Sequence, residues 1–148
     1  MHFKSNSDLV HNTLPYEAVE EFWKWCSDIN SSGLVIHLHP YGGRMNEISE
    51  SETPFPHRKG VLYELLHVVM WMEDKDGESL ENYYNKWIRG LYEFMAPYVS
   101  KRPRGAIVNS RDLDLGSNNV IGNSYSIARV WGSKYFKNNF KSWHLLKV

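Results

Sequence analysis

The sequence predicts an α+β fold: an antiparallel β-sheet with helices packed on one face. Two kinds of segment indicate it. Residues 33–39 and 61–71 are short and rich in β-branched and aromatic side chains, which is typical of strands. The segments that begin near residues 14 and 79 instead repeat apolar side chains at helical spacing. Strands mixed with helices in this order favour a sheet covered on one side, whose other face stays open.

The central strand is expected at residues 61–71, directly after a rigid turn. Pro54 and Pro56 fix the backbone ahead of it, and Gly60 lets the chain reverse. His57 and Arg58 are expected to fix this turn by hydrogen bonds. The length and apolar composition of residues 61–71 predict a strand that is buried on both faces.

Glu64 interrupts this apolar strand, although an isolated charge in apolar surroundings is costly. Side chains alternate along a strand, so Glu64 shares one face with Leu66, Val68 and Met70. The other face has Tyr63, Leu65, His67, Val69 and Trp71. Two interpretations remain open. Either the Glu64 face lines an active site, or Glu64 is structural and paired with a neighbour.

Two further strands and a first helix are expected in the N-terminal part. Residues 3–12 allow a strand, and residues 33–39 alternate as a second one. Thr13 is the expected cap of a helix that has Pro15 in its first turn. The apolar face of that helix is Val19, Phe22, Trp23 and Cys26.

The C-terminal half is expected to hold two more helices. Ser79 is the expected cap of a long helix that Pro97 closes. Its apolar face is Leu80, Tyr84, Trp87, Ile88, Leu91 and Met95. A short strand is expected at residues 106–109, and Arg111 and Asp112 are expected to form an ion pair. A last helix, capped by Asn123 or Ser124, has one face made of Ile127, Trp131 and Tyr135.

Composition excludes several classes of function. The 148 residues suit a single domain, and the formal net charge of zero gives no reason to expect a nucleic acid or a membrane as partner. The single Cys26 excludes an internal disulfide and a cysteine-rich metal site. His37 and His39 point the same way on a strand, as metal ligands often do, but no third ligand follows at a diagnostic spacing, so no metal is predicted. Asn30 begins a glycosylation sequon that matters only in the secretory pathway.

Several long motifs occur in one order along the chain. Residues 53–71 contain F-P-H-R-K-G before a strand that starts with Tyr and ends in Trp. The others are P-Y-G-G-R-M-N-E-I-S-E-S-E-T-P at 40–54, P-Y-V-S-K-R-P-R at 97–104, V-N-S-R-D-L-D-L-G at 108–116 and A-R-V-W-G-S-K-Y-F-K-N-N-F at 128–140. Together they resemble the berberine bridge enzyme-like flavoproteins, which are plant FAD-linked oxidoreductases. The resemblance covers residues 3–140.

The resemblance implies a site on the open sheet face, which would form the roof over the flavin ring. In this family a flavin oxidises an alcohol, a sugar or an alkaloid by taking a hydride, while a base on the substrate domain removes a proton. The family places that base at the position of Glu64 or two residues on, at the position of Leu66. Leu66 cannot move a proton, so Glu64 is the candidate base and Leu66 is implied as a pocket residue. Ser110 stands where the family usually has Tyr or His. Asn109 is implied beside the flavin ring. The resemblance also implies His39 as a pocket residue and a strand at residues 45–48.

The resemblance further implies that residues 1–148 are the substrate-domain and C-terminal portion of a larger flavoprotein. Its N-terminal FAD-binding domain is expected outside these residues, so FAD is not expected to stay bound to this chain alone. The implied partners are that domain and a small-molecule substrate. Family members are secreted or vacuolar, while residues 1–8 have no apolar signal core. The alternative is a free-standing, non-catalytic domain that binds a small ligand or a partner protein.

Overall fold

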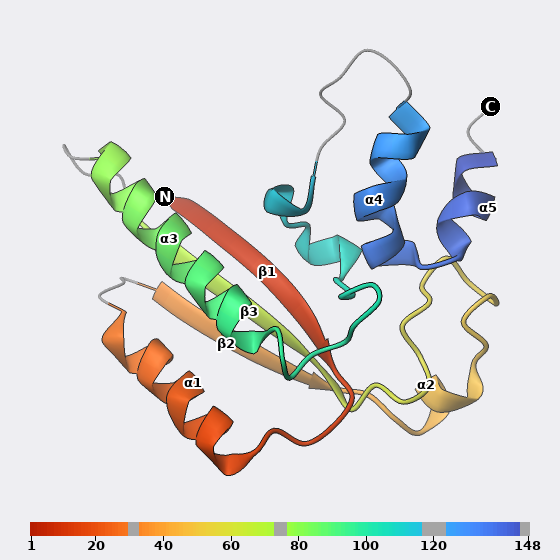
Figure 1. Cartoon of the computed structure of the whole chain (residues 1–148), viewed down its shortest axis with the longest axis horizontal. Coiled ribbons are helices and arrows are strands. Elements are labelled where there is room, and N and C mark those ends of the chain that lie inside the picture. Colours follow the sequence, from red (N-terminus) through yellow and green to blue (C-terminus); the bar gives the residue numbers. More distant parts are fainter. Residues whose placement is uncertain (30–32, 73–76, 117–123, 146–148) are drawn as a thin grey trace.

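The computed structural model describes residues 1–29, 33–72, 77–116 and 124–145. Three strands, β1 (His2–Val10), β2 (Gly33–Pro40) and β3 (Tyr63–Trp71), form one antiparallel sheet in the order β1-β3-β2 (Figure 1). The strands predicted at residues 3–12, 33–39 and 61–71 are thereby confirmed. The sequon at Asn30 and the expected cap at Asn123 lie outside the described residues.

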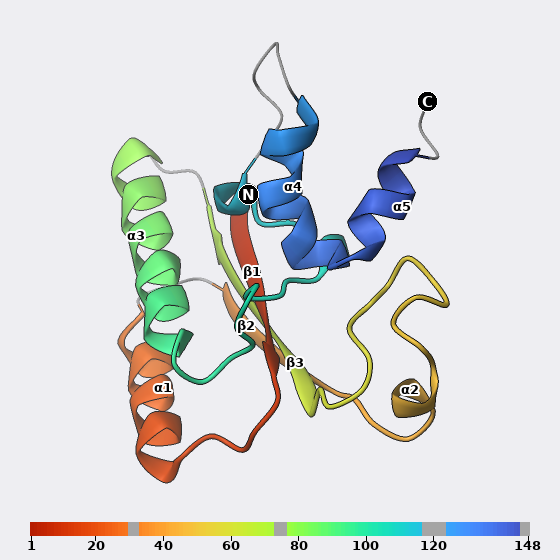
Figure 2. The same cartoon turned by 45° about the vertical axis from the view of Figure 1, so that its right-hand side comes forward.

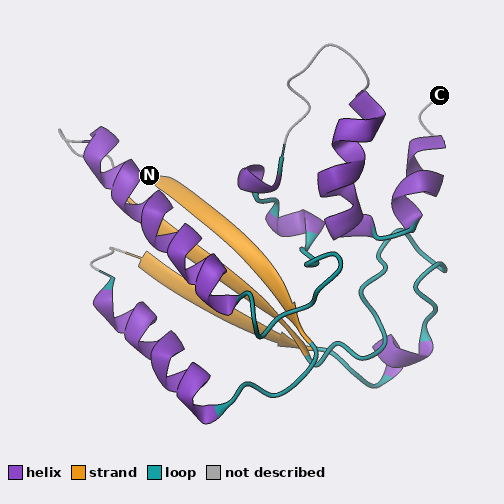
Figure 3. Cartoon of the chain, in the orientation of Figure 1, coloured by secondary structure: helices purple, strands orange, loops and turns teal. Residues whose placement is uncertain are grey.

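Two helices cover one face of the sheet. They are α1 (Tyr16–Asp28) and α3 (Gly77–Met95), which lie together on one side of the strands. The short α2 (Arg44–Glu47) and the C-terminal α4 (Ser124–Phe136) and α5 (Asn139–Leu145) lie away from them (Figure 2). In the described ranges, the chain outside the three-stranded sheet is helix and loop (Figure 3). The predicted α+β class, with helices packed on one sheet face, is therefore confirmed.

The alternation predicted for β3 is visible in its burial. Leu65, Val69 and Trp71 are buried in the core beneath α1 and α3, while Leu66 and Val68 on the opposite face are only half-buried. The expectation of burial on both faces was wrong, because α1 and α3 cover only one of them. We call the second face the open face. By strand register it consists of Phe3, Ser5, Ser7, Leu9, Val35, His37, His39, Glu64, Leu66, Val68 and Met70.

Helix α1 presents only part of the predicted face to the core. Phe22 and Cys26 pack on the core as predicted, together with Trp25, whereas Val19 and Trp23 are exposed. The helix has apolar side chains on two faces, and periodicity alone does not say which of them meets the sheet. Its N-cap is Pro15, without a side-chain cap, so the prediction of Thr13 was also wrong.

Helix α3 buries the predicted face. Its core residues are Tyr84, Trp87, Ile88, Leu91 and Met95, with Leu80 packed at the edge. The helix begins at Gly77, however, so Ser79 lies inside the first turn and is not the cap.

Two short segments differ from the predicted strands. Residues 44–47 form α2, because the N–H groups of Met45 and Asn46 bond back to the carbonyls of Gly42 and Gly43 at 3.0 Å. Residues 108–110 form the 3₁₀-helix η1 (Val108–Ser110). The N–H ahead of it, on Ile107, donates to a side-chain oxygen and not to a neighbouring strand.

The C-terminal elements pack around aromatic side chains. Tyr135 of α4 is buried as predicted, whereas Ile127 is 38% exposed. The helix α5 was not predicted. The expected ion pair between Arg111 and Asp112 is not found among the described residues: Asp112 lies 3.2 Å from the Lys4 ammonium, and the Arg111 guanidinium lies over the Trp131 ring. Residues 113–115 form the 3₁₀-helix η2 (Leu113–Leu115).

Candidate functional site

The open face carries a cluster of three polar side chains around Glu64. The strand register places His39 of β2 directly opposite Glu64 of β3, with Leu9 of β1 on its other side. The Tyr41 hydroxyl donates a hydrogen bond to Glu64 Oε2 at 3.2 Å, and His39 Nδ1 lies 3.6 Å from the same oxygen. The Glu64 carboxylate therefore has two partners, His39 and Tyr41, which lie two positions apart in one segment.

The three side chains differ in burial, and their roles differ accordingly. Glu64 is 7% exposed, so Tyr41 supplies a partner that an otherwise isolated charge would lack. Burial and then the Glu64 charge raise the pKa of Tyr41, which keeps its hydroxyl protonated as a donor. The His39 side chain is 52% exposed and marks the open side of the cluster.

Local structure explains why Tyr41 meets Glu64. Tyr41 follows the last residue of β2, and its backbone N–H donates to the Leu62 carbonyl at 2.8 Å, just before β3 begins. This bond extends the β2–β3 pairing by one step beyond the ladder. The Phe55 ring lies against the Tyr41 ring, with 6.3 Å between centroids, and restricts its position.

The proline turn is fixed by the two residues predicted to fix it. The Arg58 guanidinium donates to the Phe55 carbonyl at 3.1 Å and to Thr53 Oγ1 at 2.7 Å. His57 Nε2 lies 2.9 Å from the Tyr135 carbonyl oxygen and donates to it, which joins the turn to α4. These bonds confirm a structural role for both side chains.

The other candidate residues lie on or beside the same face. Leu66 occupies the next row, between His37 and Ser7. The Ser7 hydroxyl accepts the Ile107 N–H at 2.8 Å, which ties the segment leading into η1 to the β1 side of this face. Two members of η1 are the remaining candidates, exposed Asn109 and half-buried Ser110.

The structure thus brings Glu64, His39 and Leu66 together by register alone. None of the hydrogen bonds found in the described residues joins Asn109 or Ser110 to Glu64. Tyr41 was not among the site residues predicted from the sequence. Its position two residues after His39, at the end of a strand beside the Glu64 strand, is the signal that identifies it.

The chain is similar in sequence and fold to part of several plant proteins. The chain is 46% identical over 143 residues to Berberine bridge enzyme-like 28 of Arabidopsis thaliana, covering 94% of this chain and 26% of that protein. The solved structure of that relative superposes with a TM-score of 0.85 over 94% of this chain and 29% of its own. The tetrahydroberberine oxidase of Berberis wilsoniae is 48% identical over 142 residues, or 93% of this chain and 25% of the relative. No family model matches the chain.

The chain belongs to the berberine bridge enzyme-like family. The homologues in this family are FAD-dependent oxidoreductases. They include a grass pollen allergen, Phl p 4, described as having glucose dehydrogenase activity; it is 37% identical, with a TM-score of 0.81 over 94% of this chain and 28% of its own. The chain spans about a quarter of the length of the curated relatives it matches.

The described residues form neither a metal site nor a reactive thiol site. Across the described ranges, no group of three or more His, Cys, Asp or Glu side chains is placed to hold a metal ion. His37 and His39 stack with 5.4 Å between ring centroids. No described helix is both long and apolar enough to cross a membrane. Cys26 is a half-buried free thiol, and burial raises its pKa to about 11, which makes it a poor nucleophile.

Proposed function

We propose that residues 1–148 are the substrate-binding portion of a plant FAD-linked oxidoreductase, with the open face as the roof of the reaction site. One observation carries the proposal. The only sheet face that α1 and α3 leave uncovered is the face on which Glu64, Tyr41 and His39 converge. A buried carboxylate with a hydroxyl donor, at the edge of an accessible surface, is the arrangement that a general base requires.

Each side chain of the cluster has a distinct role in this proposal. Glu64 accepts the proton that leaves the substrate. Tyr41 orients the carboxylate through its hydrogen bond, and His39 borders the substrate on the exposed side. Bound FAD supplies the acceptor for the hydride that leaves the same substrate. The base on the protein takes the proton and the cofactor takes the hydride, and together these are the two hydrogens that an alcohol or an amine loses on oxidation.

The open face fits a planar ring system. Leu66, Val68 and Met70 are half-buried along β3 and present an apolar strip next to the polar cluster. Ring-binding sites combine such apolar surface with a few placed polar groups. Asn109, which is exposed on η1, is the proposed hydrogen-bond partner at the ring edge. A separate FAD-binding domain is the proposed partner that holds the rest of the cofactor.

The relatives suggest the substrate class. Their names include an oxidase of tetrahydroberberine, an alkaloid, and a protein with glucose dehydrogenase activity. We propose for this chain a small alcohol, sugar or alkaloid-like substrate. The half-exposed His39 is the side chain of the cluster best placed to contact it.

A second function is supported by two side chains. Leu66 cannot move a proton, and the Ser110 hydroxyl is a poor base at neutral pH. If Glu64 is structural, the open face binds a small ligand or a partner protein without catalysis. Whether Glu64 acts as a base therefore distinguishes the catalytic proposal from the non-catalytic one.

A chimera tests the proposed function. The matching segment of Berberine bridge enzyme-like 28 is replaced by this chain, which the TM-score of 0.85 makes practicable. Flavin content is measured by absorbance, and turnover is measured with tetrahydroberberine and glucose. We expect Glu64→Gln to lower turnover by about two to four orders of magnitude without loss of flavin, the usual contribution of a general base. Ser110→Tyr is expected to raise turnover.

The matched control is Glu47→Gln in the same chimera. Glu47 is an exposed carboxylate on α2 that pairs with Arg44 at 2.6 Å. Its replacement is expected to leave turnover unchanged. If Glu64→Gln behaves like this control while flavin is bound, Glu64 is structural and the non-catalytic function is the correct one.

A further inference from the structure

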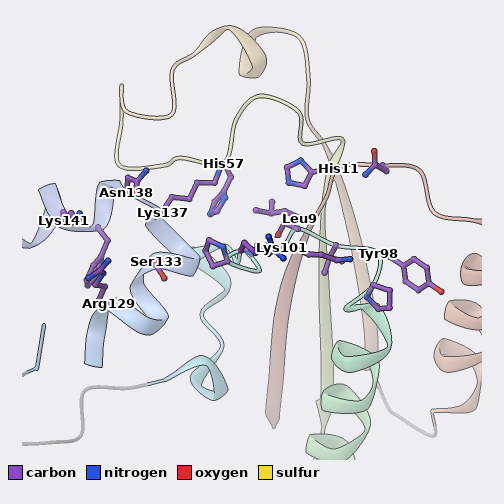
Figure 4. A pocket seen from close by; sticks show the side chains of 18 residues that line it. Leu9, His11, His57, Tyr98, Lys101, Arg129, Ser133, Lys137, Asn138 and Lys141 are labelled. Carbon is purple, nitrogen blue, oxygen red and sulfur yellow. Dashed lines mark hydrogen bonds between the residues drawn. The ribbon is translucent and has the colours of Figure 1, made fainter. Parts of the chain in front are cut away.

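A basic pocket lies outside the Glu64 cluster, between the end of β1, the 97–105 segment and the α4–α5 region (Figure 4). Its volume is about 730 Å³. Five cationic side chains line it, Lys101, Arg102, Arg129, Lys137 and Lys141, and no Asp or Glu is among its lining residues. The full chain has 17 basic and 17 acidic residues, so this segregation is local and is not a consequence of composition.

Most of these charges have no counter-ion in the described part of the chain. Lys137 pairs with Glu50 at 2.5 Å. For Lys101, Arg102, Arg129 and Lys141, the described residues place no carboxylate within salt-bridge distance. Four like charges around one cavity repel each other and raise the local positive potential. A bound anion is the simplest way to offset that repulsion.

A buried polar atom in the wall of the pocket also lacks a partner. His57 is 1% exposed and lies between Lys137 on one side and Leu9 and Lys101 on the other (Figure 4). Its Nε2 donates to the Tyr135 carbonyl, and its Nδ1 has no hydrogen-bond partner. Buried polar atoms without partners are rare in native proteins and often mark a missing ligand or water. Because Nε2 carries the proton, Nδ1 of the neutral ring is an unused acceptor, which suits a hydroxyl or N–H group on the body of a ligand and not the anion itself.

The five cationic side chains around the pocket favour a phosphate group over a single carboxylate. A single carboxylate offers one charge and two oxygens, whereas a phosphate group offers about two charges and three terminal oxygens. Lysine and arginine together suit such a group, since Lys acts as a point charge and Arg donates in a fork. The cavity exceeds the size of a phosphate, and Leu9, Val99, Pro103 and Phe140 give it an apolar wall. The ligand therefore has an organic body.

We propose that this pocket binds a small molecule that carries a phosphate group. The phosphate lies among Arg129, Lys137 and Lys141, at the α4–α5 end, and the body extends toward Leu9 and Val99. The site is separate from the Glu64 cluster and does not depend on the oxidoreductase function.

Titration calorimetry of the 148-residue chain with inorganic pyrophosphate, at constant ionic strength, tests the proposal. We expect saturable binding, at least about tenfold tighter than the binding of succinate. The double variant Arg129→Gln/Lys141→Gln is expected to weaken it by about tenfold to a hundredfold, as the loss of charge-assisted hydrogen bonds implies. The control Lys59→Gln/Lys86→Gln removes the same charge from exposed side chains that do not line this pocket, and is expected to bind like the parent.

A spectroscopic readout is independent of calorimetry. Burial and then the Lys137 charge lower the pKa of His57 to about 4. Since a bound anion offsets the Lys137 charge, pyrophosphate is expected to raise the pKa of His57 in an NMR titration. Three results would overturn the proposal: no saturable binding, equal binding of succinate, or equal loss in the control variant. Tighter binding of a hexaglutamate peptide would replace it with a docking surface for an acidic protein segment.

Discussion

Replacing Arg104 with Met should destabilise the chain strongly at neutral pH and weakly in acid. Arg104 Nε and Nη2 donate to the two Asp8 carboxylate oxygens at 2.6 and 2.7 Å. The Asp8 side chain is fully buried, and the guanidinium also lies 3.3 Å from the centre of the Tyr92 ring. The substitution removes the only cation bonded to this carboxylate among the described residues and keeps an aliphatic side chain over Tyr92.

The magnitude follows from the burial of Asp8. Removing one partner of a buried ion pair costs about 3–5 kcal/mol, because the other charge is left without compensation. Even with Arg104 present, burial raises the pKa of Asp8 from 3.8 to about 6. Ionising Asp8 therefore costs the folded state about 3 kcal/mol above pH 6. Because the folded pKa exceeds the unfolded one, this penalty is absent below pH 3.8 and grows as pH rises toward 6.

Urea unfolding at pH 7.5 and pH 4 measures the effect. We expect Arg104→Met to lose about 3–5 kcal/mol at pH 7.5 and clearly less at pH 4, where Asp8 is protonated in the folded state. Adding Asp8→Asn to Arg104→Met should recover most of the loss at pH 7.5. A loss under about 1 kcal/mol, or the same loss at both pH values, would refute a buried and uncompensated Asp8 charge as the cause.

The control is a pair with the same geometry at the surface. Arg89 bonds both carboxylate oxygens of Asp114 at 2.7 and 2.9 Å, but its side chain is 59% exposed. Solvent screens such a pair, so Arg89→Met is expected to cost less than about 1 kcal/mol. The contrast between the two variants isolates burial as the cause.

Three further outcomes are expected. Burial lowers the pKa of His67 from 6.5 to about 3, so the free energy of unfolding has its full value above pH 6.5 and falls by about 2 kcal/mol at pH 5. Urea unfolding of His67→Gln at several pH values should lack this part of the pH dependence. An unchanged pH dependence would show that His67 is not its source. A Cβ at Gly132 would meet the Phe140 ring within 2.7 Å, so Gly132→Ala should lower the melting temperature by loosening α4 from α5, at a cost of about 1–3 kcal/mol; an unchanged melting temperature would show that the ring can move aside. The apolar strip on the open face favours self-association, so sedimentation should show that Val68→Lys shifts the chain toward monomer; a parent chain that is already monomeric would show that the strip needs no cover.

The predictions from the sequence succeeded where a repeating pattern meets a single available partner surface. Period-2 alternation in β3 placed Glu64 on the face opposite Leu65 and Val69, and the two faces differ in burial: Leu66 and Val68, beside Glu64, are half-buried, whereas Leu65 and Val69 are buried. Helical spacing likewise selected the buried face of α3. In α3 the apolar side chains lie on one side of the helix, so burial has only one solution, whereas in β3 the strict alternation of a strand fixes which side chains share a face.

The same reasoning was wrong where the pattern is short or has two solutions. Helix α1 has apolar side chains on two faces, and contact with the sheet selected Trp25 over Trp23. Residues 44–47 and 108–110 are too short to carry a period, and local turn bonds decided their form. Family motifs placed a strand at residues 45–48, where the chain forms a helix.

The sequence by itself determined the strands, the long helices and the face on which Glu64 lies, because these depend on side chains a few positions apart. Only the tertiary structure decided the pairing of Tyr41 with Glu64, the bond between Asp8 and Arg104 and the basic pocket. Each of these joins segments that are distant in the chain. The order β1-β3-β2 and the path of residues 97–145 beside the sheet bring them together, and no local period encodes that path.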